Sequence, residues 1–404
     1  MLKLRQLPLA LAIAAATSQV NAAGFAINEH SAAGLGRANA GEAAIADDAS
    51  TISHNPAGLT RIKTNTVTGA LAYVDPTVKI DGPTDSLSSS SSAPSAVVPA
   101  GYFAAPINDK LVLGLGMYSD FGFKTDYDKD FGALASADVS DIVAYYLTGS
   151  MGYKVTDQLS LGLGISVVHA TAELSSALPG GEVNLMQLEG DDTTYGWNVG
   201  ALYEFNEATR VGLSYKSEVK LSFDGDIKSD FIPAWNAGGS ADLDLPAMLE
   251  LAGYHDINDQ FAVHASIQRT YWSSFEELAI KVDNNGGTQV PVVIEDYQDV
   301  MRYSVGATYT LNPEWTLRAG IAYDETPSTD EHRTLRLPDS SRVLYSVGAT
   351  WNVSDKMNID AGYQYVDGET SSIEEPTSPI APNDTTFSAT NSAHILSVGG
   401  SYKF

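Results

Sequence analysis

The strongest constraint on this chain is a two-residue alternation of apolar and polar side chains that runs from about residue 64 to the end. In residues 303–311, tyrosine, valine, alanine and leucine occupy every second position, with serine, glycine and threonine between them. Residues 344–353 repeat this pattern, and a third apolar face is predicted from Val211 to Phe223. Because side chains alternate across a strand, each run predicts a β-strand with one apolar and one polar face.

The two faces differ in composition. The polar faces are small and rich in hydroxyl groups, whereas the apolar faces carry tyrosine and tryptophan near the strand ends. Such faces are typical of a membrane barrel with lipid outside and a polar lumen. In a soluble sandwich the apolar faces would form the core instead. Alternation alone does not separate the two architectures, so the connections and the chain ends must decide.

The connections between the strands fall into two classes. Short polar turns are centred at 107–109, 156–158, 206–208, 258–259, 312–314 and 354–356. Longer stretches rich in Ser, Asp, Gly and Pro span 81–95, 122–138, 175–192, 225–241, 283–293, 326–339 and 367–389. Short turns on one rim and long loops on the other are typical of outer-membrane barrels. We therefore predict an all-β fold, a transmembrane antiparallel β-barrel of about 14 strands over residues 62–404.

Both chain ends favour the membrane barrel. Lys3 and Arg5 precede an apolar run over 7–16, and residues 20–22 offer small side chains at a cleavage position. This arrangement predicts a secretory signal peptide in residues 1–22 and a mature chain that begins at Ala23. The last strand ends on Tyr402 and Phe404, which resembles the recognition signal for barrel assembly. We expect a multi-pass protein in the outer membrane of a Gram-negative bacterium.

Charge and composition exclude several classes of function. The chain has 50 acidic and 23 basic residues, a net charge of −27 that repels nucleic acid. It has no cysteine, which excludes a thiolate metal site and a cysteine nucleophile. Its seven histidines follow no motif spacing, and Gly-x-Ser-x-Gly does not occur. We expect neither an enzyme nor a bound cofactor or metal.

Residues 23–61 break the alternation and form a segment of a different kind. The segment is rich in Ala and Gly, and a flexible periplasmic tail and a plug inside the lumen are both conceivable. Its spaced apolar residues exceed what a solvated tail needs, and the lumen of such a barrel is too wide for wall side chains to fill. The plug is therefore the better prediction. Its apolar residues are Ile27, Leu35, Ile45, Ile52 and Leu59.

Several motifs carry a family resemblance. In the plug segment they are Ala23-Gly24-Phe25-Ala26-Ile27-Asn28-Glu29, Gly34-Leu35-Gly36-Arg37, Ala46-Asp47-Asp48-Ala49 and Asn55-Pro56-Ala57. Together they resemble the N-terminal hatch of the FadL/TodX-type outer-membrane transporters of long-chain fatty acids. Matches at 105–109, 217–220, 245–246 and 315–322 extend the resemblance along the whole chain.

The resemblance implies a function and a mechanism. Members are monomeric barrels that take up long-chain fatty acids passively, in a ligand-gated manner. Ligand lands between outer loops, passes to a lumen pocket, and leaves sideways through a kinked strand after the N-terminus has moved. The resemblance places Ala23 and Phe25 at the pocket. It places Asn55, Pro56 and Ala57 beside the kinked strand.

We expect the kinked strand at about 110–122. Asp120, Phe121 and Gly122 carry turn chemistry where a continuous strand would alternate. Gly122 is our candidate for the kink, and Gly114 and Gly116 are alternatives.

Apolar side chains in two long loops predict an outer groove. Loops 122–138 and 175–192 contain more aromatic and aliphatic residues than solvated loops need, and exposed apolar clusters usually bind ligands. From these loops we assign Phe123, Leu134 and Leu178 to ligand binding.

The head-group site departs from the family pattern. Fatty-acid transporters of this family place basic side chains near the carboxylate, whereas residues 171–178 and 295–301 contain no Lys or Arg. Arg302 is the nearest candidate, with Lys216 and Lys220 as further ones, although pairing with lumen acids such as Glu218 explains them equally well.

The alternatives are a channel for other hydrophobic compounds such as aromatic hydrocarbons or alkanes, a general diffusion porin, and an adhesin or phage receptor. The acidic loops also suit contact with outer-membrane lipid and lipopolysaccharide through divalent ions.

Overall fold

The computed structural model describes residues 24–283, 288–289, 293–378 and 381–404. The predicted signal peptide and Ala23 lie outside the described residues. Within them, no helix is long and apolar enough to cross a membrane.

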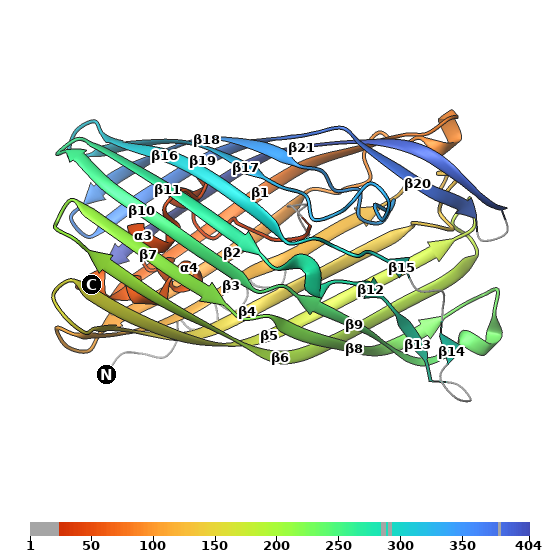
Figure 1. Cartoon of the computed structure of the whole chain (residues 1–404), viewed down its shortest axis with the longest axis horizontal. Helices are drawn as coiled ribbons and strands as arrows, with labels where there is room; N and C mark the ends of the chain where they lie inside the picture. Colours follow the sequence, from red (N-terminus) through yellow and green to blue (C-terminus); the bar gives the residue numbers. More distant parts are fainter. Residues whose placement is uncertain (1–23, 284–287, 290–292, 379–380) are drawn as a thin grey trace.

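The described strands close into one antiparallel barrel (Figure 1). Pairing of the first strand with the last, from Thr66↔Lys403 to Asp81↔Ser388, completes the wall. The wall has fourteen strands. Along it β7 continues as β8, and β9 continues as β10. The wall consists of β1 (Thr66–Asp81), β2 (Ala96–Pro106), β3 (Leu111–Asp126), β4 (Val139–Lys154), β5 (Leu159–Ala177), β6 (Asn184–Glu204), β7 (Thr209–Lys216) with β8 (Val219–Lys228), β9 (Ala237–Leu245) with β10 (Met248–Asn258), β11 (Phe261–Thr270), β16 (Val300–Thr310), β17 (Trp315–Asp324), β18 (Arg342–Ser354), β19 (Met357–Gly368) and β21 (Ala381–Lys403).

The remaining elements are short. Outside the wall strands lie β12 (Glu277–Leu278), β13 (Ile280–Val282), β14 (Thr288–Gln289), β15 (Val293–Ile294) and β20 (Ser371–Ser378), and the 3-10 turns η3 (Asp85–Leu87), η4 (Pro233–Trp235) and η5 (Trp272–Ser274). The N-terminal segment contains α2 (Ala32–Leu35), α3 (Glu42–Ile45), α4 (Thr51–His54) and η2 (Pro56–Arg61).

The faces of the wall confirm a barrel with an apolar exterior. Leu71, Leu115 and Val305 point outward and are 48%, 51% and 54% exposed, whereas small polar residues such as Thr148 and Ser304 are buried inside. The predicted fourteen strands and six short turns are also confirmed, and the short turns gather at the end of the barrel that holds the C-terminus (Figure 1).

Four of the seven long loops are shorter than predicted. Strand β3 extends to Asp126 into the predicted loop 122–138, and β5 and β6 leave only residues 178–183 of the predicted loop 175–192. The loop 367–389 is largely taken by β20 and β21. These strand ends are rich in Ser and Asp, as loops are. Their composition therefore gives no sign that their backbones pair in a sheet.

The predicted apolar face from Val211 to Phe223 is wrong beyond the end of β7. Leu213 points outward and is 47% exposed, but Leu221 and Phe223 of β8 are buried in the lumen. The break at residues 217–218 shifts the alternation by one position, which moves every following side chain to the other face. Lys220 consequently lies outside the lumen, 77% exposed, where it pairs with Glu218 and Asp244.

Residues 24–61, called the hatch below, lie inside the barrel (Figure 1). Helix α2 packs against β18 and β19, α3 against β7 and β10, and η2 against β4, β5 and β6. Wall glycines allow this close approach, since a methyl group on Gly162, Gly212 or Gly320 would collide with the hatch backbone. At these glycines the hatch backbone packs directly against the backbone of the wall strands.

Candidate functional site

The first residues of the hatch pair with the wall as a short strand. We call residues 24–31 the hatch arm. Ala26 and Phe121 form an isolated antiparallel bridge. The Ile27 N–H donates to the Asp120 carbonyl at 2.7 Å, and the Gly122 N–H donates to the Phe25 carbonyl at 2.8 Å. The arm therefore binds β3 through its backbone, without regard to side-chain identity.

The wall is irregular at this point. Strands β2 and β3 are paired from Pro106↔Val112 to Gly101↔Met117, and their described register ends there. Residues 96–100 of β2 remain paired with β1 alone. On the other edge of β3, the register with β4 shifts between Ser119 and Phe121, so Asp120 occupies a bulge. A bulge bends its strand, and here the bend coincides with the separation of β3 from β2.

An aromatic cluster surrounds Phe25, which is completely buried. The ring of Phe25 lies 4.6 Å from Trp272, 5.6 Å from Phe123, 5.9 Å from Phe275 and 6.1 Å from Phe121, measured between centroids. Tyr297 extends the cluster, with its ring 5.0 Å from that of Phe275. We call Phe25, Phe121, Phe123, Trp272, Phe275 and Tyr297 the aromatic cluster. It joins the hatch arm, β3 and the segment after β11 into one apolar body.

The residue before Phe121, Asp120, carries a buried carboxylate. Asp120 Oδ1 is 3.0 Å from His30 Nε2 of the arm and 2.6 Å from Lys216 Nζ of β7. His30 Nε2 also lies 3.1 Å from the Ser119 carbonyl oxygen. Because both neighbours of Nε2 are acceptors, this nitrogen carries the proton and donates. This polar junction fixes the arm to the bulge through His30 and Asp120.

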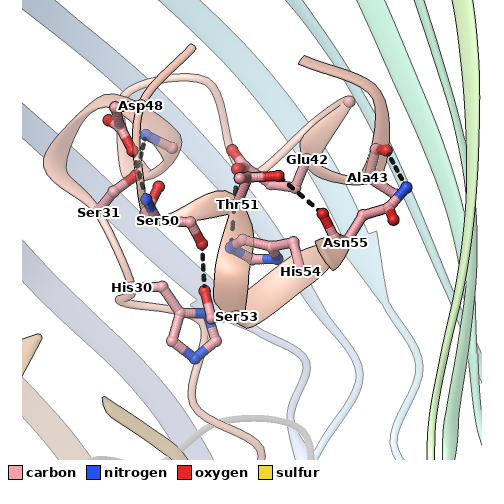
Figure 2. A network of polar contacts seen from close by, with 12 residues as sticks. His30, Ser31, Glu42, Ala43, Asp48, Ser50, Thr51, Ser53, His54 and Asn55 are labelled. Atoms are coloured by element: carbon pink, nitrogen blue, oxygen red, sulfur yellow. Dashed lines mark hydrogen bonds and ion pairs between the residues drawn. The ribbon is translucent and has the colours of Figure 1, made fainter. Parts of the chain in front are cut away.

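Asn55 links the hatch to the wall. Its Oδ1 accepts from the Ala57 N–H at 3.0 Å, and its Nδ2 donates to the carbonyls of Ala43 at 2.6 Å and Ala201 of β6 at 3.0 Å. Figure 2 shows Asn55 reaching Ala43 across the hatch, with Asp48, Ser50 and Ser53 bonded beside it. Pro56 and Ala57 begin η2, where a residue without an N–H costs no hydrogen bond.

The structure brings some predicted site residues together and separates others. Phe25, Phe123, Asp120, Phe121 and Gly122 meet at the arm and the bulge. Asn55, Pro56 and Ala57 lie among β4, β5 and β6, within the body of the hatch. The roles of all these residues remain predictions.

The residues assigned to the predicted outer groove belong to different parts of the outer end. Leu134 belongs to another apolar cluster, with Tyr127 and Leu335. Leu178 is half-buried at the tip of the β5–β6 hairpin, and its N–H bonds to the Val183 carbonyl at 2.9 Å. Phe123 belongs to a different apolar cluster from Leu134. A groove that joins the three residues stays a prediction.

Arg302 of β16 faces the hatch. Its contact with the hatch is a long bond of 3.5 Å to the Ala38 carbonyl, and its other terminal nitrogen is buried without a partner in the described residues. It lines a small polar cavity with Asn39 and His54.

No sequence pattern singled out one basic residue of the site, Arg336, or three aromatic ones, Trp272, Phe275 and Tyr297. Trp272 and Phe275 follow the end of β11. The segment that contains them is rich in aromatic residues, which is the same signal that singled out loop 122–138. Arg336 lies in the connection between β17 and β18, where residues 333–340 are buried. It donates to the Ser175 carbonyl at 2.7 Å, to Ser176 Oγ at 2.6 Å and to Ser140 Oγ at 3.1 Å. No local pattern predicts that an outer loop folds inward.

Comparison with known proteins identifies the family. Residues 13–404 match the model of the family described as "Outer membrane protein transport protein (OMPP1/FadL/TodX)". The chain is 34% identical to the "Long-chain fatty acid transport protein" of Escherichia coli O6:H1, over 91% of this chain and 92% of that protein. It is 35% identical to the "47 kDa outer membrane protein" of Pasteurella multocida, over 100% and 99% of the two chains.

Solved structures agree with this assignment. A Pseudomonas aeruginosa FadL homologue superposes with a TM-score of 0.85 at 25% identity, covering 95% of this chain and all of the other. The Pseudomonas putida toluene transporter TodX shares the fold, with a TM-score of 0.72 at 17% identity over 95% and 100% of the two chains. The chain therefore belongs to the OMPP1/FadL/TodX family of outer-membrane transport proteins.

Proposed function

We propose that this protein carries long-chain fatty acids passively across the outer membrane, with the aromatic cluster as the lumen site. The proposal is supported by relatives about one-third identical over 92% and 93% of their length, which are named long-chain fatty acid transport proteins. The observation that carries it is the position of Phe25: the arm that fills the cluster is also the strand that pairs with the bulge in β3. Each barrel encloses its own arm and cluster, which favours a monomer as the working unit.

An alkyl chain gains free energy in the cluster by leaving water, at about 0.8 kcal/mol for each methylene group. Phe25 fills this space in the closed state, because its ring contacts four other aromatic rings. A ligand therefore has to displace Phe25 to bind. Since Phe25 is bonded through its carbonyl to Gly122, displacement of the ring pulls the arm from β3.

Arg336 is our candidate for the carboxylate partner. Residues 171–178 contain no basic side chain, but the guanidinium of Arg336 reaches them from the β17–β18 connection and binds Ser175 and Ser176. Burial lowers the pKa of Arg336 although nearby carboxylates raise it. All its described hydrogen-bond partners are neutral oxygens, so an arriving carboxylate would be the first ionic partner in contact with this charge.

The separation of β2 from β3 is our candidate for the exit. Beyond Met117 the wall lacks the β2–β3 ladder in the described residues, and the hatch arm takes up the backbone groups of Asp120 and Gly122 instead. Withdrawal of the arm would free these groups and open the wall toward the bilayer interior. The bilayer interior stabilises an alkyl chain, and on this sideways route the ligand does not have to cross the polar outer leaflet.

Uptake of labelled oleate tests the substrate. The protein is supplied to a Gram-negative strain that lacks its own transporter, and barrel assembly is checked by heat-modifiable gel mobility. We expect uptake to be restored, and to be lost on deletion of residues 23–25. If an assembled barrel takes up toluene or an alkane but no oleate, the substrate is a neutral hydrocarbon and not a fatty acid.

A disulfide tests the movement of the arm. Ala26 and Phe121 form a non-hydrogen-bonded antiparallel pair, for which the Cα separation is about 4.5 Å, within the range a disulfide needs. In Ala26→Cys with Phe121→Cys we expect oxidation to stop uptake and a reductant to restore it. The chain has no other cysteine, and each single variant serves as a control. Equal uptake in the oxidised and reduced double variant would exclude the arm as the gate.

A further inference from the structure

His30 joins two parts of the hatch that are held in different ways. On one side, residues 24–29 run along β3 and into the aromatic cluster. On the other side, Ser31 caps α2: its Oγ accepts from the Gly34 N–H at 2.9 Å, and its carbonyl accepts from the Leu35 N–H at 3.0 Å. The hatch body, residues 32–61, thus begins directly after this junction.

Residues 24–29 are held mainly by neutral contacts. Two backbone hydrogen bonds tie this stretch to β3, and its large apolar side chains, Phe25 and Ile27, are buried. The Glu29 carboxylate accepts from the Asn28 N–H at 2.9 Å, a bond that lies within the stretch. An alkyl chain can replace the apolar contacts and water the backbone bonds, because a neutral hydrogen bond contributes little net free energy.

His30 is held from three directions at once. Its Nε2 donates to Asp120 Oδ1 of β3 at 3.0 Å, and its carbonyl accepts from the Tyr102 hydroxyl of β2 at 3.3 Å. Its ring meets the ring of Tyr118 edge to face at 5.4 Å and that of His54 in the hatch body at 4.9 Å, measured between centroids. These contacts fix both the backbone and the side chain of His30.

Withdrawal of His30 would remove a partner from a buried charge. Asp120 is 2% exposed, and its carboxylate is bound by His30 and by Lys216 Nζ, the latter at 2.6 Å. Taking a donor away from a buried carboxylate costs more free energy than exchanging a neutral backbone bond for water. A movement that leaves His30 in place therefore has the lower cost.

Two small polar cavities lie beside the stretch just before His30. Both are bordered by Asn28, and each has room for about one water molecule. They also share His54, Glu250 and Gln268 as lining residues, and His54 Nε2 has no hydrogen-bond partner in the described part of the chain. A peptide group that rotates at Asn28 can find hydrogen-bond partners in these walls.

We propose that His30 is the fixed pivot of the gate: residues 24–29 swing away from β3, while His30 stays bound to Asp120 and the hatch body keeps its place. The inference rests on the proposed function, because it divides the arm of that gate into a moving and a fixed part. His30 is then a positioning residue. With the hatch body in place the floor of the lumen stays closed, so the ligand has to leave through the wall.

Two single-cysteine variants report on the two parts separately. The chain has no cysteine of its own, and Ala26 and Ala33 are 9% and 4% exposed. The intact protein in lipid nanodiscs is treated with a maleimide, with and without oleate, and the modification rate is measured by mass spectrometry. If the arm is open at most about a tenth of the time without ligand and mostly open with it, the rate in Ala26→Cys should rise about tenfold or more. The rate in Ala33→Cys should not change.

The outcomes separate this inference from the proposed function. A rise in both variants would show that the arm and the hatch body move together, which overturns the pivot and leaves the gate intact. A rise in neither would show that oleate does not move the arm, which overturns the gate and the pivot with it.

Two substitutions separate the bond of His30 from the packing of its ring. His30→Phe keeps a ring beside Tyr118 and His54 but has no donor for Asp120, whereas His30→Gln keeps a donor and loses the ring. With His30→Phe, oleate should raise the modification rate of Ala33→Cys about tenfold, as it does for the arm. With His30→Gln the rate should stay unchanged. An unchanged rate in His30→Phe would overturn the role of the bond, and the comparison of Ala26→Cys with Ala33→Cys decides the matter if His30→Phe does not assemble.

Discussion

Several contacts that hold the hatch are hydrogen bonds between a side chain and a backbone group. Asn55 bonds two carbonyls and one N–H, and Arg210 of β7 donates to the carbonyls of Ala44 and Ile45. The motif Asn55-Pro56-Ala57 was visible in the sequence, but the partners of Asn55 lie 12 and 146 positions away along the chain. Sequence pattern identified the residue, and only the packed hatch reveals what it bonds.

Asn55→Ala should loosen the hatch and leave the barrel assembled. The substitution removes three hydrogen bonds, and at about 1 kcal/mol each the seating of η2 should weaken by about 2–3 kcal/mol. Faster hydrogen exchange in residues 56–61, with unchanged heat-modifiable mobility, is the expected result. Asn55→Asp keeps the acceptor for Ala57 but sets a carboxylate oxygen against the carbonyls of Ala43 and Ala201, so it should loosen η2 at least as much as Asn55→Ala. Unaltered exchange in Asn55→Ala would mean that Asn55 does not hold η2.

Asp48 should make the hatch sensitive to pH. Burial, and next the negative charge of Asp47, raise the pKa of Asp48 from 3.8 to about 7. A raised carboxyl pKa favours the protonated folded state, so this stability is complete below about pH 4 and is lost as the pH rises through 7. Opening of α4, measured by hydrogen exchange of residues 50–54 after correction for intrinsic rates, should increase between pH 5 and 8 by at most about tenfold per pH unit.

Asp48→Asn provides the matching control for this titration. It cannot ionise and retains an oxygen for the Ser50 N–H, which Asp48 binds at 2.7 Å. Its corrected exchange should be independent of pH over the same interval. The same pH dependence in this variant would assign the titration to another group.

At the scale of elements, the prediction succeeded where one local rule operates. The six turns follow from their short polar sequences, and the outward faces of β16 and β18 follow from alternation. The rule failed at β7 and β8, because a break of two residues reverses the faces and leaves no mark in the composition. It also failed at the outer strand ends, where side chains no longer meet lipid and polar residues occupy paired positions.

The close contact between hatch and wall gives a prediction about glycine. In Gly162→Ala of β5 the new methyl group would overlap the backbone of Pro56 and Ala57, whereas around Gly149 of β4 there is open space. Overpacking of this kind costs about 1–3 kcal/mol. Gly162→Ala should therefore speed hydrogen exchange in η2 and lower the unfolding temperature of the barrel, while Gly149→Ala should change neither. Equal behaviour of the two variants would contradict a tightly seated hatch.

At the scale of the whole molecule, the sequence predicted the barrel but not how its outer end is filled. Strand number follows from repeated local patterns, whereas the aromatic cluster joins Phe25, Phe121 and Trp272 from three distant segments. The β17–β18 connection folds inward and contacts both β5 and the arm, through Arg336 and through Asp339, which accepts from the Gly24 N–H at 3.0 Å. Such contacts depend on the closed shape of the barrel, so no local pattern predicts them.

This inward connection makes a prediction about the ligand head group. If Arg336 binds the carboxylate, Arg336→Met should reduce oleate uptake much more than uptake of methyl oleate, which has the same chain without the charge. A hydrogen bond to a charged group contributes about 1.5–3 kcal/mol, so a loss of about tenfold to a hundredfold is expected for oleate. Arg336→Lys should retain part of the uptake, since it keeps the charge but loses the forked geometry.

Arg302→Met is the control that separates the two basic candidates. Arg302 lies against the hatch at Ala38 rather than beside Ser175 and Ser176, so its loss should affect oleate and methyl oleate alike. Because Arg336 also holds its connection to β4 and β5, a purely structural role would lower the uptake of both ligands equally in Arg336→Met. Discrimination between acid and ester is therefore the decisive measurement. If Arg302→Met lowers oleate uptake more than methyl oleate uptake, and Arg336→Met lowers both equally, the head group binds at the hatch and not at the outer connection.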